Sequence, residues 1–510
     1  MANRTKKSAN NMIFGFIEQV VTLLLSFVTR TIFIRYLGSE YLGINGLFTN
    51  ILSFLSIAEL GFGTAIIYGM YKPIKDGDKK KIAALMYYYR KIYTILAIVI
   101  AVLGVIVIPF LKYLVNTESD IPNITLYYLV FLVDSICSYL LANRVAIIEA
   151  NQNSYIIKRY TTVFIIIKNI LQIISLVIFK NFLVYLVIQV SITILTNIYG
   201  ALVAKKMYPY AFKKEQLDKY EKKKMMENVK AMAIYRFGGA IMNHTDNILI
   251  SVICGTINVG LYSNYNMITS AINRFTNIIF NSITASIGNL NAEDNQSKKL
   301  KMFYNVEFFS NWIFGFCSVM LFVLINQFVS LWLGDKYILD IWTTSAIVAN
   351  FYILGVLKPN LTYRDTTGLF KETKYIFLIT ATINLVLSII LGKLCGVFGI
   401  LIASAIARLS TNFWFEPRTL FEKYFGVSSK KYFMDRILNI GLTIGSILIS
   451  LLLIQAVSQW ISSKLAIFIA SCVIAACISN LLFVISYKKR DEYNYFKGFL
   501  IKIKKKIIKG

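Results

Sequence analysis

The sequence predicts an all-α, polytopic membrane protein with about 14 transmembrane helices. Apolar runs of about 20 residues recur along the whole chain, which is the length that spans a hydrocarbon core about 30 Å thick. Hydrophobic residues make up 57% of the 510 residues and charged residues only 16%, a balance that a soluble protein of this size does not have. The Lys and Arg residues also fall mainly into alternate connections, as they do in membrane proteins.

The apolar runs predict two six-helix lobes and an appended C-terminal helix pair. The expected domains are an N-terminal lobe (1–210), a cytoplasmic linker (211–228), a C-terminal lobe (229–425), the extra helix pair (426–487) and a basic cytoplasmic tail (488–510). The expected spans are 11–37, 43–70, 84–111, 122–148, 155–179, 183–204, 229–254, 260–290, 301–331, 338–363, 375–393, 397–417, 433–456 and 464–487.

The distribution of positive charge predicts the orientation of the chain. One side holds only Lys112, Lys180, Lys336, Lys393 and Lys464, and the cations inside spans include Arg30, Arg35, Lys168, Arg236, Arg274, Lys358 and Arg408. Most of the 54 Lys and Arg residues therefore lie on the side that holds both termini, which we expect to be cytoplasmic at the plasma (inner) membrane. The net charge of +28 then implies contact with anionic membrane lipid, and no nucleic-acid partner is expected.

The C-terminal stretch 493–509, YNYFKGFLIKIKKKIIK, alternates apolar and basic residues. This pattern is typical of an interfacial amphipathic helix that binds anionic lipid. A solvated basic tail explains the same composition, and the sequence leaves both interpretations open.

An internal repeat links the two predicted lobes. The segment GSEYLG at 38–43 is echoed by GTINVG at 255–260, an offset of 217 residues, and each closes one span and opens the next. Arg144 and Tyr155 likewise correspond to Arg364 and Tyr375 at an offset of 220. Two halves in the same orientation indicate a parallel repeat, which in transporters has its substrate site at the interface of the halves.

The first hairpin, residues 30–73, carries three charges within apolar sequence: Arg30, Arg35 and Glu59. An ionisable residue inside a membrane segment is costly, which makes each of them a candidate for function. Arg35 stands three residues before Gly38 and can extend outward to the interface. Arg30 lies eight residues before Gly38, about 12 Å deeper at 1.5 Å per residue, and is the better candidate for binding an anion.

Arg274 lies near the middle of the span that opens at Gly260. A stripe of polar residues runs beside it at spacings of three and four, which places them on one face of a helix: Asn266, Ser270, Asn273, Asn277 and Asn281. A polar helix face inside a membrane must line a cavity or contact another helix. We expect this face to line a cavity and Arg274 to bind an anionic ligand there.

The acidic residues of the spans leave two interpretations open. Glu59 and Asp246 can pair with the arginines or take part in ion coupling, and His244, the only histidine, stands two residues before Asp246. No GxxxxGK[ST], GxSxG or HExxH motif occurs, and the six cysteines have no metal-ligand spacing. The sequence therefore predicts a non-enzyme with no catalytic residue, metal or cofactor.

Several short motifs resemble the Wzx-type oligosaccharide (polysaccharide) flippases of the multidrug/oligosaccharidyl-lipid/polysaccharide exporter superfamily. The resemblance covers essentially the whole chain in span number, orientation and repeat. The motifs are RYLGSEYLGING at 35–46, AELG at 58–61, YKP at 71–73, YRK at 89–91, Asp246 followed by CG at 254–255, GLY at 260–262 and GLF at 368–370.

The resemblance implies a flippase that moves an undecaprenyl-pyrophosphate-linked oligosaccharide from the inner to the outer leaflet by alternating access, for export of a surface polysaccharide. Relatives that flip lipid II are similar in using arginines of the first and eighth helices for the pyrophosphate. The matching positions here are Arg30 and Arg274, with Arg35 a looser match. The polymerase or glycosyltransferases of the same pathway are the expected protein partners. An ion-coupled drug/cation antiporter of the same superfamily is the alternative.

Overall fold

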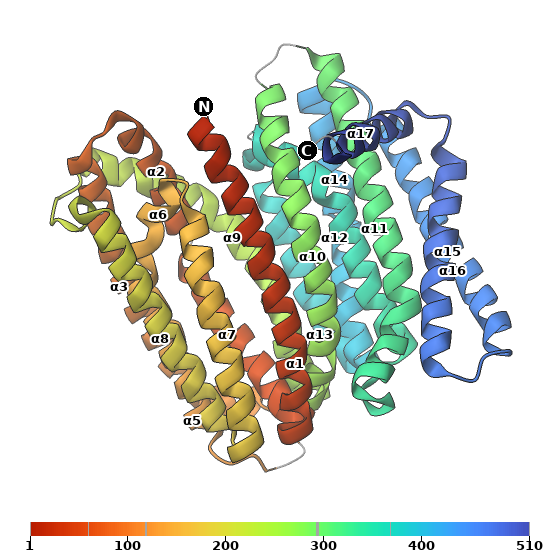
Figure 1. Ribbon diagram of the computed structural model, residues 1–510, viewed down its shortest axis with the longest axis horizontal. Coiled ribbons are helices and arrows are strands. Elements are labelled where there is room, and N and C mark those ends of the chain that lie inside the picture. Colours follow the sequence, from red (N-terminus) through yellow and green to blue (C-terminus); the bar gives the residue numbers. More distant parts are fainter. Residues whose placement is uncertain (1, 60, 118–119, 292–294, 368, 509–510) are drawn as a thin grey trace. The chain divides into compact units, whose positions relative to one another are not determined.

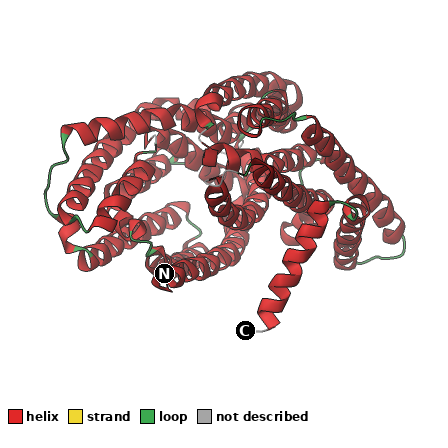
Figure 2. Ribbon diagram, turned by 90° about the horizontal axis from the view of Figure 1, so that it is seen from above, coloured by secondary structure: helices red, strands yellow, loops and turns green. Residues whose placement is uncertain are grey.

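The computed structural model describes residues 2–508 except 60, 118–119, 292–294 and 368, and all regular secondary structure in this part of the chain is helical (Figure 2). The chain divides into two compact units, Met1–Ser263 and Asn264–Gly510. The predicted all-α membrane fold is confirmed. The predicted domain boundaries stay predictions, and the predicted turn at Gly368 lies outside the described residues.

The first unit contains nine α-helices and four short 3₁₀ turns among its described residues (Figure 1). They are α1 (Ala2–Leu55), η1 (Ser56–Glu59), α2 (Phe62–Asp76), α3 (Lys79–Val107), η2 (Ile108–Phe110), α4 (Leu111–Leu114), α5 (Ile124–Ala142), η3 (Asn143–Val145), α6 (Ala146–Ala150), α7 (Ser154–Phe179), α8 (Phe182–Met207), η4 (Pro209–Phe212) and α9 (Lys219–Cys254).

The second unit begins within α10 and continues through the C-terminal helices. Its elements are α10 (Thr256–Asn291), α11 (Gln296–Leu333), η5 (Asp335–Tyr337), α12 (Ile341–Thr367), α13 (Phe370–Ser410), α14 (Asn412–Leu420), the π-helical turn η6 (Phe421–Phe425), α15 (Lys430–Ser458), α16 (Lys464–Tyr487) and α17 (Asp491–Ile508).

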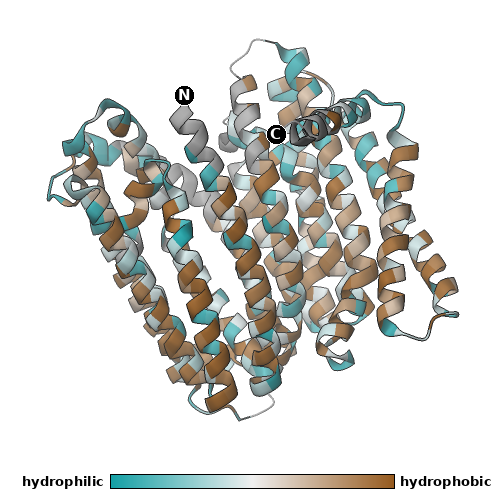
Figure 3. Ribbon diagram, in the orientation of Figure 1, coloured by the Kyte–Doolittle hydropathy of each residue, from teal (hydrophilic) through white to brown (hydrophobic). Residues whose placement is uncertain are grey.

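Ten helical segments of the described chain are long and apolar enough to cross a membrane. One of them, Tyr375–Phe425, contains both predicted spans 375–393 and 397–417, because α13 continues past Gly396, where the backbone leaves the helical conformation. Another, Asn10–Leu55, contains the predicted span 11–37 and only the first part of 43–70, because α1 continues past Gly38 and ends at Leu55. The described remainder of 43–70 lies in η1 and α2. The predicted spans 229–254 and 260–290 correspond to α9 and α10, which are too polar to be counted among the ten. The predicted total of 14 stays a prediction. In Figure 3, apolar residues cover the middle of α3, α15 and α16 and hydrophilic residues gather at their ends.

The two glycine turns of the internal repeat have the same backbone geometry. Gly38 has φ 85° and ψ 176°, and Gly255 has φ 93° and ψ 151°, a region that side chains other than glycine avoid. The expected break at 38–43 is shorter than its polar sequence suggested, since only Gly38 is non-helical and the helix resumes at the next residue. The repeat is therefore visible in the fold as two matching chain reversals.

The second glycine of each turn packs against the other turn. A Cβ atom on Gly43 would lie 1.9 Å from the carbonyl oxygen of Thr256, and one on Gly260 would lie 2.1 Å from that of Ser39. Thr256 follows Gly255 as Ser39 follows Gly38, so Thr256 and Ser39 occupy equivalent positions of the repeat. In each contact, the second glycine of one turn packs against this position of the other turn. This reciprocal contact lies within the first unit and requires glycine at both positions.

The core of the first unit is built on α3. Its buried apolar side chains pack with those of α2 and α6 and with Ala211 and Leu217, which follow α8. Because α9 starts at Lys219, part of the predicted linker is helical, and the ion pair between Lys81 and Glu221 joins the start of α9 to the start of α3. The segment after α8 is thus part of the first unit.

In the second unit, α11 packs against α12, α15, α16 and α17. The Phe303 ring contacts Tyr363, Phe421 and Tyr432, and the Phe496 ring of α17 lies 4.9 Å from Trp312. The tail is accordingly helical from Asp491, and its first turns are docked through Tyr493 and Phe496. The side chains of residues 502–510 lie outside the described set, so lipid binding by the basic end stays a prediction.

Candidate functional site

The polar stripe predicted around Arg274 lies on α10. Asn266, Arg274 and Asn277 are exposed, whereas Ser270 and Asn273 are half-buried. The Ser270 hydroxyl donates to Asn266 Oδ1 at 3.3 Å. The side chains of Asn281, the last member of the stripe, and of Arg236 lie outside the described set. The face thus offers amide oxygens, amide N–H groups and one guanidinium at its surface.

Arg274 has no hydrogen-bond or ion-pair partner among the described residues, and its side chain is exposed. A guanidinium presents five N–H donors in a planar fork that matches the oxygens of a phosphate. An exposed arginine on a polar face of a long helix is therefore suited to bind an anion that comes from outside the protein.

Lys358 also contacts this face, which no feature of the sequence predicted. Its Nζ donates to Asn277 Oδ1 at 2.8 Å and to Thr276 Oγ1 at 3.2 Å, and it lies 4.7 Å from the centroid of the Phe314 ring. Lys358 comes from α12, some 80 residues further along the chain. The sequence shows Lys358 only as an isolated lysine within a predicted span, and this does not reveal that it contacts α10.

Arg30, in α1, is half-buried and is held by the second turn of the repeat. Its Nη1 donates to Ser263 Oγ at 2.7 Å, and that hydroxyl donates to the carbonyl of Gly260 at 2.8 Å. The preceding residue, Thr29, is buried and donates to Asn169 Oδ1 at 2.7 Å. Arg30 is therefore positioned by hydroxyl and backbone groups close to the reciprocal glycine contact.

Arg35 lies one and a half turns further along α1 and is exposed. It has no hydrogen-bond partner among the described residues. Its place three residues before Gly38 agrees with an outward-reaching side chain, and its part in ligand binding stays a prediction.

The three groups proposed for ion coupling or charge pairing have separate surroundings. Glu59 lies in η1 and accepts a hydrogen bond from the Tyr93 hydroxyl, and the Tyr93 ring packs edge-on against Tyr89 at 4.4 Å. His244 Nδ1 lies 3.4 Å from Asn50 Oδ1, and Asp246 is half-buried on the same helix, α9. The role of these groups stays a prediction.

Three other arginines of the second unit are engaged by the protein itself. Arg436 is fully buried and bonds Asn311, the Val356 carbonyl and the Tyr432 hydroxyl, with the Glu307 carboxylate 3.4 Å away. Arg364 pairs with buried Glu416 at 3.0 Å, and Arg408 donates to Asn350 Oδ1 at 2.6 Å. Because the Arg436 and Arg364 charges are balanced inside the fold, these two side chains hold helices together.

No metal site is found among the described residues, since no three His, Cys, Asp or Glu side chains gather in that part of the chain. All six cysteines are free thiols. The chemistry of the candidate residues is that of anion binding by guanidinium, ammonium and amide groups.

Comparisons with known proteins identify relatives of this fold. The family model described as "Polysaccharide biosynthesis protein" matches residues 8–284. No curated protein sequence matches the chain. Among solved structures, the lipid II flippase MurJ in an inward closed conformation is 12% identical, with a TM-score of 0.65 over 93% of this chain and 99% of its own.

Multidrug transporters have the same fold. An inward-facing MATE family transporter of the MOP superfamily is 14% identical, with a TM-score of 0.57 over 78% of this chain and 95% of its own. A mutant of the Vibrio cholerae MATE transporter VcmN is 14% identical, with a TM-score of 0.54 over 83% of this chain and 99% of its own. These structures have the same helical fold as this chain, and the family model confirms the predicted membership of a polysaccharide family.

Proposed function

The chain belongs to the polysaccharide biosynthesis protein family, and from this premise we propose that it flips an undecaprenyl-pyrophosphate-linked oligosaccharide from the inner to the outer leaflet of the plasma membrane. The family and fold are those of membrane flippases and transporters. The observation that carries the proposal is the exposed polar face of α10, with Arg274 and the adjoining Lys358. In this proposal both termini are cytoplasmic, and polymerase or glycosyltransferases supply and consume the substrate.

The chemistry of the substrate fits the candidate residues. A pyrophosphate linkage presents several oxygens and about two negative charges, which bidentate guanidinium groups bind well. We assign this role to Arg274 and Arg30, with Arg35 as an outer contact. The sugar hydroxyls need neutral donors and acceptors, which Asn266, Asn273 and Asn277 provide on the same face as Arg274.

The membrane potential favours the proposed direction. Each elementary charge moved across the membrane is worth about 2.3 kcal/mol per 100 mV, so outward movement of two negative charges gains about 4–5 kcal/mol per 100 mV in an inside-negative cell. Reconstituted vesicles with an imposed potential would show faster outward flipping when the substrate side is negative.

A second function, ion-coupled drug or cation antiport, rests on a different group of residues. The Glu59 carboxylate lies with the Tyr93 and Tyr89 hydroxyls, an acidic and aromatic setting that suits an organic cation or a coupling ion. In that case Glu59→Gln would abolish transport of a fluorescent organic cation, and Arg274→Ala would leave it intact.

The decisive experiment measures flipping of a labelled undecaprenyl-pyrophosphate disaccharide in proteoliposomes, by protection of the label from an external quencher. Charge-assisted hydrogen bonds contribute about 1.5–3 kcal/mol, so Arg274→Ala should slow flipping by about 10- to 100-fold. Arg418→Ala is the matched control, because Arg418 is another exposed arginine of the second unit without a partner among the described residues. Equal rates for the two variants would refute the assigned anion site.

Complementation provides the cellular counterpart of this assay. A strain that lacks the protein should regain surface polysaccharide with the wild-type chain and with Arg418→Ala, and fail to regain it with Arg30→Ala or Arg274→Ala at equal expression. Full polysaccharide with both arginine variants would favour a role other than flipping, such as a scaffold for the pathway's enzymes.

A further inference from the structure

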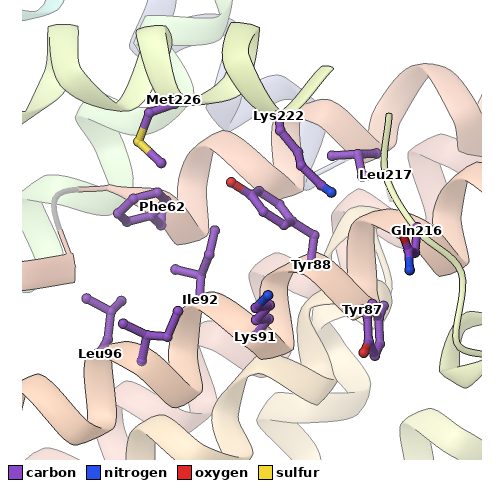
Figure 4. A pocket seen from close by; sticks show the side chains of 11 residues that line it. Phe62, Tyr87, Tyr88, Lys91, Ile92, Leu96, Gln216, Leu217, Lys222 and Met226 are labelled. Atoms are coloured by element: carbon purple, nitrogen blue, oxygen red, sulfur yellow. The ribbon is translucent and has the colours of Figure 1, made fainter. Parts of the chain in front are cut away.

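A pocket of about 450 Å³ lies in the first unit, where α3 meets the start of α9 and the segment before it, and none of the candidate substrate residues named above lines it. Figure 4 shows two kinds of lining. Phe62, Leu96 and Met226 lie on one side and the ammonium group of Lys222 on the other, and the Tyr88 side chain lies between them with its hydroxyl toward Phe62 and Met226. Its volume is within the range of small-molecule sites in proteins.

The polar half of the pocket is cationic. Neither Lys91 nor Lys222 forms an ion pair with a described carboxylate. The nearby Glu221 is engaged by Lys81, and Asp218 accepts from the backbone N–H of Tyr220 at the N-terminus of α9. The Lys222 ammonium, which comes from α9, lies 6.0 Å from the centroid of the Tyr88 ring. This contact with the ring keeps the ammonium group at the pocket. Two ammonium groups without a carboxylate partner in the described chain suit a phosphate group.

The apolar half of the pocket continues into a lipid-facing surface. Ile95 lines the pocket and is 51% exposed, and Ile98, Val102 and Val105 follow it on α3 with similar exposure. Their spacing of three and four residues makes one helix face. This stripe crosses the predicted span 84–111, so an acyl chain that leaves the pocket would stay in contact with an apolar surface.

The charge bias of the sequence places this end of α3 on the cytoplasmic side, where anionic phospholipids concentrate. We propose that the pocket binds an anionic phospholipid. Its phosphate would lie between Lys91 and Lys222, and its acyl chain would lie over Phe62, Ile92 and Leu96. The bound lipid would join α3 to the segment that leads into α9.

The test is binding of a spin-labelled phosphatidylglycerol to the full-length protein in detergent, with phosphatidylcholine and inorganic phosphate as competitors. The double variant Lys91→Gln/Lys222→Gln should weaken phosphatidylglycerol binding at least tenfold. The control variant Lys75→Gln/Lys80→Gln removes the same charge from exposed lysines near the same membrane side but outside the pocket lining, and should change binding less than twofold.

A second variant separates a phospholipid from a free phosphate. Ile95→Gln changes an exposed side chain of the apolar half, so the fold should be retained, and it should weaken phosphatidylglycerol binding severalfold. Effective competition by inorganic phosphate, together with no effect of Ile95→Gln, would assign the site to a free anion and overturn the proposal. An equal loss with the control variant would show attraction to the general surface charge, and equal binding of phosphatidylcholine would show that the site does not recognise the anionic headgroup. Either result would also overturn the proposal.

Failure here is distinct from failure of the proposed flippase. Loss of lipid binding in Lys91→Gln/Lys222→Gln can be measured without any transport substrate. Conversely, Arg274→Ala should leave phosphatidylglycerol binding unchanged, because Arg274 does not line this pocket.

Discussion

Arg274 and Arg436 are two arginines of the second unit with opposite surroundings. Arg436, near the start of α15, is fully buried against Asn311, Tyr432, the Val356 carbonyl and Glu307. Arg274, in the middle of α10, is exposed and has no partner among the described residues. The arginine near the start of its predicted span, Arg436, is buried inside the fold, and the one in the middle of its predicted span, Arg274, is exposed.

The difference teaches that depth in a predicted span does not distinguish a buried, compensated cation from an exposed one. A buried cation is tolerated when a carboxylate and several acceptors compensate its lost hydration. An exposed cation beside amides and hydroxyls keeps its donors for an incoming anion. Arg364, which pairs with Glu416, resembles Arg436 in this respect, and Lys358 is intermediate.

The largest expected effect is on stability, at Arg436. Arg436→Ala leaves the buried Glu307 carboxylate without its cation, which costs about 3–5 kcal/mol for a buried pair. Thermal unfolding of the purified protein should show a strongly lowered transition, and the double variant Arg436→Met/Glu307→Leu should recover much of the loss. An unchanged transition in Arg436→Ala would show that this arginine is not an anchor.

Lysine substitutions sharpen the comparison because they retain the charge and lose the planar fork. Arg436→Lys cannot reach an amide, a carbonyl, a hydroxyl and a carboxylate at once and should destabilise the protein by about 2 kcal/mol. Arg274→Lys should leave unfolding unchanged and keep part of the flipping rate. If Arg274→Lys lowered stability as much as Arg436→Lys, the proposed contrast would be wrong.

Lys358→Gln should affect both stability and transport. The substitution removes the ammonium contact with the Phe314 ring and a charged bond to Asn277, worth about 1 kcal/mol together in a half-buried setting. Flipping should fall severalfold, since one cation is lost beside the α10 stripe. Paired unfolding and proteoliposome measurements test this, with Lys336→Gln, an exposed lysine of η5, as the control. A change in unfolding alone would show that Lys358 acts as a structural residue like Arg436. A change in flipping alone would show that it acts as a ligand-binding residue, as proposed for Arg274.

The smallest effect is expected for Asn277→Ala. Asn277 is exposed and holds Lys358 through its Oδ1 atom, so unfolding should change by less than about 1 kcal/mol. Flipping should fall about as much as in Lys358→Gln, because the lysine loses its orientation. The double variant Asn277→Ala/Lys358→Gln should be no slower than the Lys358 variant, whereas additive losses would show two independent contacts.

The sequence determined the fold class and much of the repeat, because both depend on local patterns. Span length and hydrophobicity are properties of 20-residue windows, and they predicted the helical membrane protein that the structure has. The spacing of Gly38, Gly43, Gly255 and Gly260 located the two chain reversals. It did not reveal that Gly43 packs on Thr256 and Gly260 on Ser39, since contacts over more than 200 residues leave no local signature.

The tertiary structure alone decided which charges are neutralised and which are available. The sequence identified Arg30 and Arg274 as anion-binding candidates and treated Arg436 as one of many cations on the cytoplasmic side. It could not foresee that α15 buries Arg436 against α11 and α12, or that α12 brings Lys358 to α10. Whether an ionisable side chain stabilises the fold or is available to bind a ligand depends on its partners and on its exposure to water. The packing of distant helices determines both the partners and the exposure.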